Sequence, residues 1–206
     1  MELNDAIRLR RMVRTFGPDP ARPDRVDADL LDDLLDRSRR APSAGNVAAV
    51  RFLVLDDVDA VARYWDLTLA PDRRAGFAWP GLLVAPVLVV VWVEPDAYPR
   101  RYAEADKATT GRGRGVDAWP VPYWWVDAGA VVQNLLLGIV DAGLGGCLFG
   151  LFEHEEAVRA AFGVPAGWRA VGTVAIGHPG PEERRGRSAG RRRPDRDELI
   201  RRGAWG

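Results

Sequence analysis

The chain has 206 residues, of which 29 are basic and 29 are acidic, so its net charge at pH 7 is zero. This length favours a single domain with short appendages, and 47% hydrophobic residues are ordinary for a globular protein. The balanced charge excludes a role as a coat for nucleic acid, and we expect no nucleic-acid partner.

Cysteine and histidine are too scarce for most metal and disulfide chemistry. Cys147 is the only cysteine, and His154 and His178 are the only histidines, so we expect no disulfide within the chain and no metal site. The first residues, "MELNDAIRLRRMVR", do not form a secretory signal, and the longest apolar run, residues 128–140, contains Gln and Asn. We therefore expect a cytoplasmic protein without a membrane partner.

The first part of the chain predicts two helices joined by a Pro-rich connector. Asn4 is a candidate N-cap for a helix over residues 5–12, and Asp27 is a candidate cap for a second helix that ends near Ala41, before Pro42. One apolar stripe of the second helix consists of Leu30, Leu31, Leu34 and Leu35.

The next segments predict two strands of a sheet. "VRFLVLDD" indicates a buried strand, followed by a short helix over residues 57–65. "APVLVVVWVEP" contains seven consecutive apolar residues, which predicts a strand buried on both faces in the middle of the sheet. Residues 70–82 and 96–122 predict irregular structure because they are rich in Gly, Pro and Trp.

Residues 123–141 predict a long helix that is apolar on nearly every side, with Pro122 at its first position. Such a helix must be covered all around, and a second subunit would provide the missing cover. A helix over residues 153–162, a strand in "WRAVGTVAIGHP" and an Arg-rich tail follow.

Two common cofactor-binding motifs are absent. No G-x-G-x-x-G and no G-K-[ST] occurs, so dinucleotide and P-loop readings are excluded. The G-x-S-x-G at residues 186–190 lies in the Arg-rich tail and not between a predicted strand and helix, so it does not form a hydrolase elbow. Few residues could act as nucleophile or general acid, and we assign no catalytic side chain. An enzyme with this sequence would rely on a bound cofactor.

Three segments combine into a possible binding surface, although each has a simpler explanation. "RLRRMVR" could bind a ligand through its Arg side chains, or these could simply be cations that stabilise a helix end. "RAPSAGN" could form a small, polar binding surface, or it could simply end a helix. "AGRRRP" could form a second Arg cluster at the ligand, or it could be a solvated tail. Together they suit a ligand with a phosphate and a flat ring, because Arg forks bind phosphate and small residues leave room for a ring. "GLGGCLFG" adds exposed backbone, or only a tight turn.

The order of "RRMVRTF", "APSAGN", "DAGAVVQNLLLGIVDAGLGGCLFG", "VPAGWRAVGTVAIGHP" and a late Arg cluster resembles the FMN-dependent nitroreductase family. The resemblance implies one α+β domain over residues 1–206, with a mixed central β-sheet flanked by helices. It also implies an intertwined homodimer, with a C-terminal arm from about residue 180 to 206 that wraps the partner, and FMN at the interface.

Carried over by position, the resemblance implies cofactor contacts from four segments. The implied cofactor-binding residues are Arg10, Arg11, Met12, Arg14, Pro42, Ser43, Ala44, Asn46, Leu148, Phe149, Gly150, Arg191 and Arg192. Arg10 would bind the phosphate, and Arg14 would lie near the N1/O2 edge of the flavin. Residues 42–46 would reach the flavin of the other subunit, the backbone of residues 148–150 would face N5, and residues 191–193 would form a second phosphate clamp.

The resemblance implies a reaction in which NADH or NADPH gives hydride to flavin N5 and a small organic acceptor then receives it, in ping-pong order. The acceptor would be a nitroaromatic, a quinone or a similar enone. The family often continues after the Asn with x-Gln-Pro-Trp, but here residues 47–50 are Val-Ala-Ala-Val, which favours an unusual acceptor. Tyr123, Trp124 and Trp125 lie where such proteins vary their substrate pocket, and core packing is the alternative role for Trp125.

Two other functions stay open at this point. One is a relative on the same scaffold that cleaves flavin or removes halogen from a substrate. The other is a protein that binds flavin or F420 without turnover and uses residues 107–118 as a partner surface.

Overall fold

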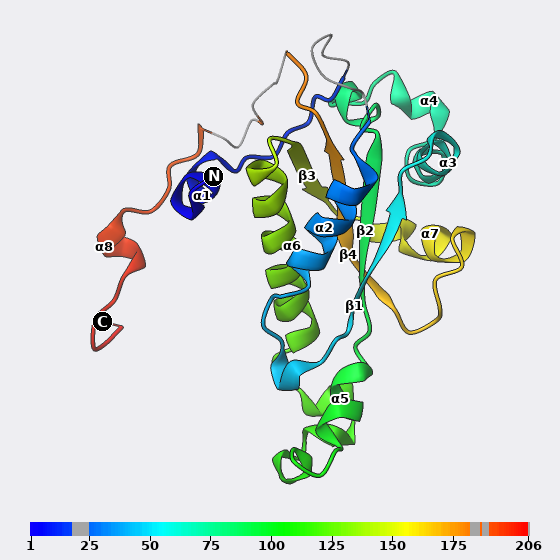
Figure 1. Ribbon diagram of the computed structural model, residues 1–206. Coiled ribbons are helices and arrows are strands. Elements are labelled where there is room, and N and C mark those ends of the chain that lie inside the picture. Colours follow the sequence, from blue (N-terminus) through cyan, green and yellow to red (C-terminus); the bar gives the residue numbers. More distant parts are fainter. Residues whose placement is uncertain (18–24, 182–185, 187–189, 206) are drawn as a thin grey trace.

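The fold is built on one four-stranded sheet. The computed structural model describes residues 1–17, 25–181, 186 and 190–205. The strands lie in the order β1-β2-β4-β3 (Figure 1), and their bounds are β1 Val50–Leu55, β2 Val87–Val93, β3 Gly145–Phe149 and β4 Arg169–Gly177. All three strand pairs are antiparallel, where we expected mixed pairing, and within the described residues parallel pairing is limited to a bridge between Met12 and Gly146. The α+β class is confirmed.

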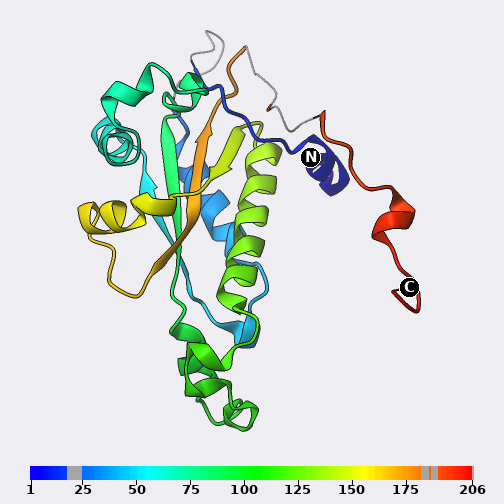
Figure 2. The same cartoon turned by 180° about the vertical axis from the view of Figure 1, so that it is seen from behind.

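Helices cover both faces of the sheet. Helices α2 (Ala28–Ser38) and α6 (Tyr123–Asp141) lie on one face, and α3 (Val58–Thr68) and α7 (Glu155–Ala161) lie on the other (Figure 2). Every residue of β2 is at most 2% exposed, which confirms its predicted central place. Its side chains alternate between two cores: the α2 and α6 side receives Val87, Val89 and Val91, and the α3 and α7 side receives Leu88, Val90 and Trp92.

The predicted N-cap is correct for α2 and wrong for α1. The Asp27 carboxylate accepts a hydrogen bond from the Leu30 N–H at 2.9 Å. Asp57, for which we predicted no cap, accepts from the Ala60 N–H at 2.8 Å. Helix α1 spans Leu3–Leu9, so Asn4 lies inside it rather than at its N-cap. Pro122 is the N-cap of α6 rather than its first helical residue.

The segment 96–122 is ordered, contrary to the prediction, because aromatic rings pack it together. Tyr98 is fully buried, and its ring contacts that of Trp119 edge-on at 5.6 Å. The Trp119 ring also contacts Tyr102 at 4.7 Å, and its Nε1–H donates to the Arg112 carbonyl at 3.1 Å. The remaining helices are α4 Pro71–Arg74, α5 Ala97–Tyr102 and α8 Arg196–Leu199, and the 3₁₀ turns are η1 Ala44–Asn46, η2 Pro80–Leu82, η3 Ala108–Thr110, η4 Arg112–Arg114, η5 Val116–Ala118 and η6 Phe152–His154.

Helix α6 is buried along one side and open along the other. Seven of its nineteen residues are buried against the sheet and α2, including Leu135 and Ile139 at 0% exposure. By length and composition it is the one helix of the described residues that could cross a membrane, a test that core helices also pass. Its open side carries Val126, Gly129 and Gln133, so one chain does not cover the helix on every side as its composition requires.

The two ends of the described chain also expose apolar side chains. On α1, Leu3 is 65% exposed and Ile7 is 55% exposed; in the C-terminal arm, Trp205 is 87% exposed. Both views place α8 and the end of the chain away from the sheet (Figures 1 and 2). These surfaces are larger than a compact monomer usually leaves uncovered.

The burial of Tyr64 between α3 and β4 predicts a pH dependence of stability. The Tyr64 hydroxyl is 2.8 Å from Thr173 Oγ1, and burial raises the pKa of Tyr64 from 10.0 to about 12. Because the folded state favours the neutral phenol, this stabilisation is complete below pH 10 and is lost as the pH rises toward 12. Tyr64→Phe should therefore flatten the fall in the free energy of unfolding between about pH 9 and pH 11.5. Urea unfolding at fixed protein concentration measures this, with the exposed Tyr123→Phe as control; equal slopes for Tyr64→Phe and the unchanged protein would contradict it.

Candidate functional site

Residues 10–14 run along the outer edge of β3. The Val13 N–H donates to the Gly146 carbonyl at 3.0 Å, and the Leu148 N–H lies 3.4 Å from the sulfur of Met12. A Cβ on Gly145 would stand 2.8 Å from the Val13 side chain, so glycine permits this close approach. Backbone groups alternate in direction along a strand, and Gly150 directly follows β3. From this alternation we infer that its N–H lies on the same edge as that of Leu148. We call Arg10, Arg11, Met12, Arg14 and residues 148–150 the edge half-site.

Arg10 offers an unsatisfied guanidinium at the edge half-site. It directly follows α1, and its Nη1 is buried with no hydrogen-bond partner among the described residues. A buried donor of this kind is costly unless an acceptor reaches it, and a cationic fork suits an anion. Arg11 is exposed. Arg14 is held differently: its Nη1 donates to the Met12 carbonyl at 3.3 Å, and its guanidinium lies 5.0 Å from the centre of the Trp79 ring.

The segment 42–46 lies at the other end of the molecule, beside the start of α6. There the Ala44 N–H donates to the Asp127 carboxylate at 2.8 Å, and the Tyr98 hydroxyl donates to the same oxygen at 2.8 Å. Asp127 is 6% exposed, and burial together with this carboxylate raises the pKa of Tyr98 well above its ordinary value. We call Pro42, Ser43, Ala44, Gly45 and Asn46 the turn half-site.

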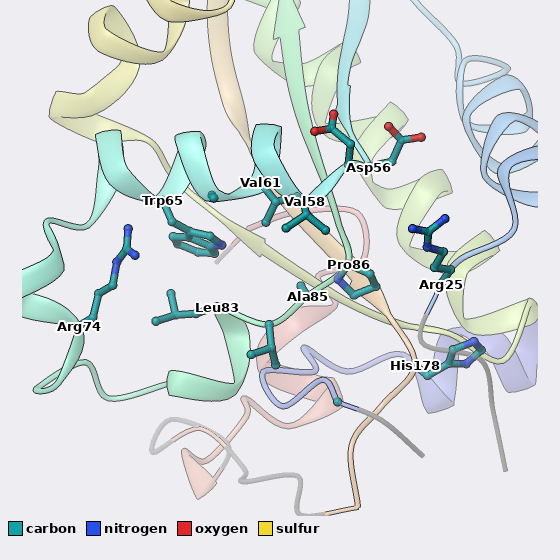
Figure 3. A pocket seen from close by; sticks show the side chains of 14 residues that line it. Arg25, Asp56, Val58, Val61, Trp65, Arg74, Leu83, Ala85, Pro86 and His178 are labelled. Carbon is teal, nitrogen blue, oxygen red and sulfur yellow. The ribbon is translucent and has the colours of Figure 1, made fainter. Parts of the chain in front are cut away.

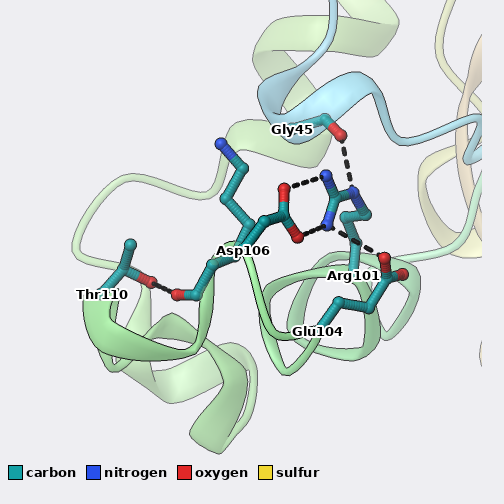
Figure 4. A network of polar contacts seen from close by, with 6 residues as sticks. Gly45, Arg101, Glu104, Asp106 and Thr110 are labelled. Carbon is teal, nitrogen blue, oxygen red and sulfur yellow. Dashed lines mark hydrogen bonds and ion pairs between the residues drawn. The ribbon is translucent and has the colours of Figure 1, made fainter.

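The sequence did not point to the groups that hold the turn half-site. Asp127 is the one carboxylate in an apolar helix before its last residue, and this isolated charge was the available sequence signal for its role. The sequence contains no comparable signal for Tyr98 or Arg101. The Arg101 Nε–H donates to the Gly45 carbonyl at 2.9 Å, and its Nη atoms each lie 2.7 Å from a carboxylate oxygen of Asp106 (Figure 4). The structure thus adds Tyr98, Arg101 and Asp127 to the predicted residues.

Helix α6 keeps the two half-sites apart within one chain. Asp127, near its start, binds the turn half-site, and Gly146 of the edge half-site's strand packs against Ile139 near its end. The Met1 ammonium contacts Asp141 at 2.7 Å and ties α1 to that end as well. Asp127 and Asp141 are fourteen residues apart, which is about 21 Å along a helix. The residues that anchor the two half-sites to α6 therefore lie toward opposite ends of the helix.

The predicted Arg cluster of the tail is not placed at the edge half-site of its own chain. Arg191, Arg192 and Arg193 are all exposed. Arg192 makes local ion pairs at 2.8 Å with Asp195 and at 2.9 Å with Glu198. Its contacts therefore lie within the C-terminal arm.

A cavity of about 650 Å³ lies on the α3 side of the sheet, and none of the predicted cofactor-binding residues lines it. Figure 3 shows Trp65, Leu83 and Arg74 toward one end, and Arg25 and His178 toward the other. The Trp65 ring stacks on Phe149 at 5.7 Å, so the cavity is separated from β3 by this indole. We do not place the cofactor here, because the unpaired Arg10 group and the free strand edge lie elsewhere.

The backbone of the turn half-site predicts a stability difference between two glycines. Gly45 and Gly143 have φ angles of +65° and +72°, but only at Gly45 would a Cβ meet an atom, Tyr102 Cε2 at 2.7 Å. Gly143→Ala should cost about 1–2 kcal/mol through backbone strain alone. Gly45→Ala should cost at least about 1 kcal/mol more because of the clash. Urea unfolding measures both, and equal costs would show that the Gly45 turn does not pack as described.

Comparison with known proteins assigns the family. The family model described as "Nitroreductase family" matches residues 7–178. An NADH dehydrogenase of Thermus thermophilus is 26% identical over 88% of this chain and 89% of its own length. A 5,6-dimethylbenzimidazole synthase of Rhodospirillum rubrum is 29% identical over 87% of this chain and 83% of its own. A putative nitroreductase of Exiguobacterium sibiricum, solved in complex with FMN, has a TM-score of 0.63 and 22% identity, with 90% of this chain and 93% of that chain covered. The relatives' names indicate an oxidoreductase, and the chain belongs to the nitroreductase family.

Proposed function

We propose that the protein is a homodimeric, FMN-dependent oxidoreductase that uses NADH or NADPH to reduce a small organic acceptor. The observation that carries the proposal is the buried Nη1 of Arg10, which has no hydrogen-bond partner among the described residues. Arg10 begins the segment that runs along the edge of β3, in a family with a member solved in complex with FMN. The donors of the edge half-site fit the cofactor, because one cationic group suits the phosphate and a row of backbone groups suits the ring edge.

Arg10 binds the phosphate in this proposal. Its Nη1 lacks an acceptor among the described residues, and a phosphate oxygen would supply one. Arg11 stands next to it, exposed, and Arg191–Arg193 of an arm would close the phosphate site from outside. Guanidinium groups suit this task because they stay charged and offer paired donors.

The backbone of β3 and the following Gly150 orients the ring. The outward N–H of Gly150 would face the flavin N5, and Phe149 is held in place by its stacking on Trp65. When bound, FMN would accept hydride at N5 from NADH or NADPH and deliver it to the acceptor in ping-pong order. The proton that the acceptor needs comes from solvent, which agrees with the lack of an assigned acid.

Arg14 provides the positive charge near the N1/O2 edge. Trp79 and the Met12 carbonyl fix its guanidinium, so the charge is already oriented before reduction. A preoriented cation stabilises negative charge that develops nearby without further reorganisation.

Two copies complete the site if their α6 helices pack side by side in opposite directions. A twofold axis then brings the turn half-site of one copy to the edge half-site of the other, at both ends. The open side of α6, with Val126, Gly129 and Gln133, provides the contact surface. The apolar side chains of α1 and of the arm, including Leu3 and Trp205, would be covered in the same way. We place this activity in the cytoplasm, with no nucleic acid or membrane involved.

A second candidate is a reaction on the flavin itself. The 29% identity with a 5,6-dimethylbenzimidazole synthase supports it, and so does the Val-Ala-Ala-Val sequence after Asn46, which lacks polar side chains for an ordinary acceptor. Exposing the reduced, FMN-loaded protein to air and analysing the products separates the two candidates. Flavin fragments would favour the second candidate, and intact FMN would favour the first.

Arg10→Ala provides the test of the main proposal. The unchanged protein should be yellow and should oxidise NADH or NADPH with a quinone or nitroaromatic compound. Arg10→Ala should weaken FMN binding by about ten- to a hundredfold, because it removes a charge-assisted hydrogen bond. FMN fluorescence quenching measures the affinity.

Arg8→Ala is the matched control, because Arg8 lies on α1, is 71% exposed and pairs only locally with Asp5. It should bind FMN as tightly as the unchanged protein. A colourless protein that takes up no FMN would contradict the proposed function, and equal affinity in Arg10→Ala would remove Arg10 from the phosphate site.

A further inference from the structure

The turn half-site has a left-handed backbone at two successive residues. Gly45 has φ of +65°, and the next residue, Asn46, has φ of +56°. Glycine adopts this conformation without strain, and asparagine adopts it more readily than most residues with a side chain, so the sequence permits the turn. The question is which groups hold this turn.

Two side chains from distant parts of the sequence form hydrogen bonds with the backbone of the turn. Asp127 of α6 accepts the Ala44 N–H at 2.8 Å, and Arg101 of α5 donates to the Gly45 carbonyl at 2.9 Å. Asp127 is 6% exposed, and its accepting oxygen also receives the Tyr98 hydroxyl. The turn is thus held by an anion at the peptide group of residues 43–44 and by a cation at the peptide group of residues 45–46.

Arg101 is itself held in one orientation. Its two Nη atoms bind the two carboxylate oxygens of Asp106 at 2.7 Å, and Nη1 also lies 3.1 Å from Glu104 (Figure 4). Asp106 raises the pKa of Arg101 above its ordinary value, and Arg101 lowers the pKa of Asp106. Both groups are therefore charged at neutral pH, and the fork points Nε toward Gly45.

These contacts leave the polar side chains of the turn available. Neither the Ser43 hydroxyl nor the Asn46 amide has a hydrogen-bond partner within the described residues, and Asn46 is exposed. A turn that is held through its backbone, with polar side chains that have no partner among the described residues, is preorganised for a ligand.

We propose that Asp127 and Arg101 are positioning residues, which hold residues 43–46 in the shape that lies against the FMN of the partner subunit. This inference rests on the proposed function, because it assumes that FMN is the ligand and that FMN binds at the edge half-site of the partner subunit. In this arrangement Asp127 and Arg101 contact the turn and not the cofactor, and they act on the cofactor through the turn.

The first experiment compares FMN affinities of substituted dimers. Asp127→Ala and Arg101→Ala should each weaken FMN binding by about tenfold or more, because the turn loses a charged partner. Asp127→Asn should restore most of the affinity, since its amide oxygen can still accept the Ala44 N–H. Arg100→Ala is the matched control for Arg101: it lies on the same helix, and its ion pair is with Glu94, so it should bind FMN normally.

The second experiment asks whether Asp127 serves the partner's site. Subunits carrying Arg10→Ala and subunits carrying Asp127→Ala are coexpressed with different tags, and the mixed dimer is purified. Both defects then fall on one site, while the other site combines an intact Arg10 with an intact turn. The mixed dimer should bind one FMN with the affinity of the unchanged protein, whereas either homodimer should bind weakly at both sites.

The outcomes separate the two claims. If the unchanged protein binds no FMN, the proposed function is wrong. If it binds FMN but Asp127→Ala and Arg101→Ala bind equally tightly, the positioning role is wrong and the proposed function stands. If the mixed dimer recovers no tight site, Asp127 supports only the fold of its own subunit, and this inference is overturned.

Discussion

The packing of α6 along the sheet determines where every binding group of this protein can lie. Leu135 and Ile139 on its sheet-facing side are fully buried, and at Gly138 a Cβ would stand 2.9 Å from Leu34 of α2. This close packing fixes Asp127 and Asp141, near its two ends, about 21 Å apart. In the proposed site, a ligand takes the groups at the two ends from two chains.

The chemistry proposed for the site depends on charge and backbone rather than on reactive side chains. The edge half-site offers an unpaired guanidinium at Arg10, a fixed one at Arg14 and the outward N–H of Gly150. None of these groups is a nucleophile or a general acid. Such a site suits a cofactor that carries the reaction itself while the protein supplies binding, orientation and electrostatic stabilisation.

The sequence predicted the parts of the fold whose signals are local. Helix α6 has the predicted bounds, β2 is central as its seven apolar residues require, and Asp27 caps α2 through a residue three positions away. Segment 96–122 was read incorrectly, because its order comes from contacts among Tyr98, Trp119 and their aromatic neighbours rather than from periodicity.

The candidate site was predictable only in pieces. Family order identified the segments around Arg10, Asn46 and Gly150, but nothing in the spacing indicated that the second lies far from the other two in one chain. The supports of the turn were also hidden, because Asp127 lies 83 residues from Ala44 and Arg101 lies 56 residues from Gly45. Contacts over such distances follow from the fold, and a single sequence contains no local signal for them.

The central claim is that two chains share each cofactor site, and native mass spectrometry tests it most directly. The account predicts a particle of two 22.7 kDa chains that carries two FMN molecules and that loses FMN when the dimer is dissociated. A monomer that retains one tightly bound FMN would contradict it, because a single chain would then hold the cofactor without the second half-site.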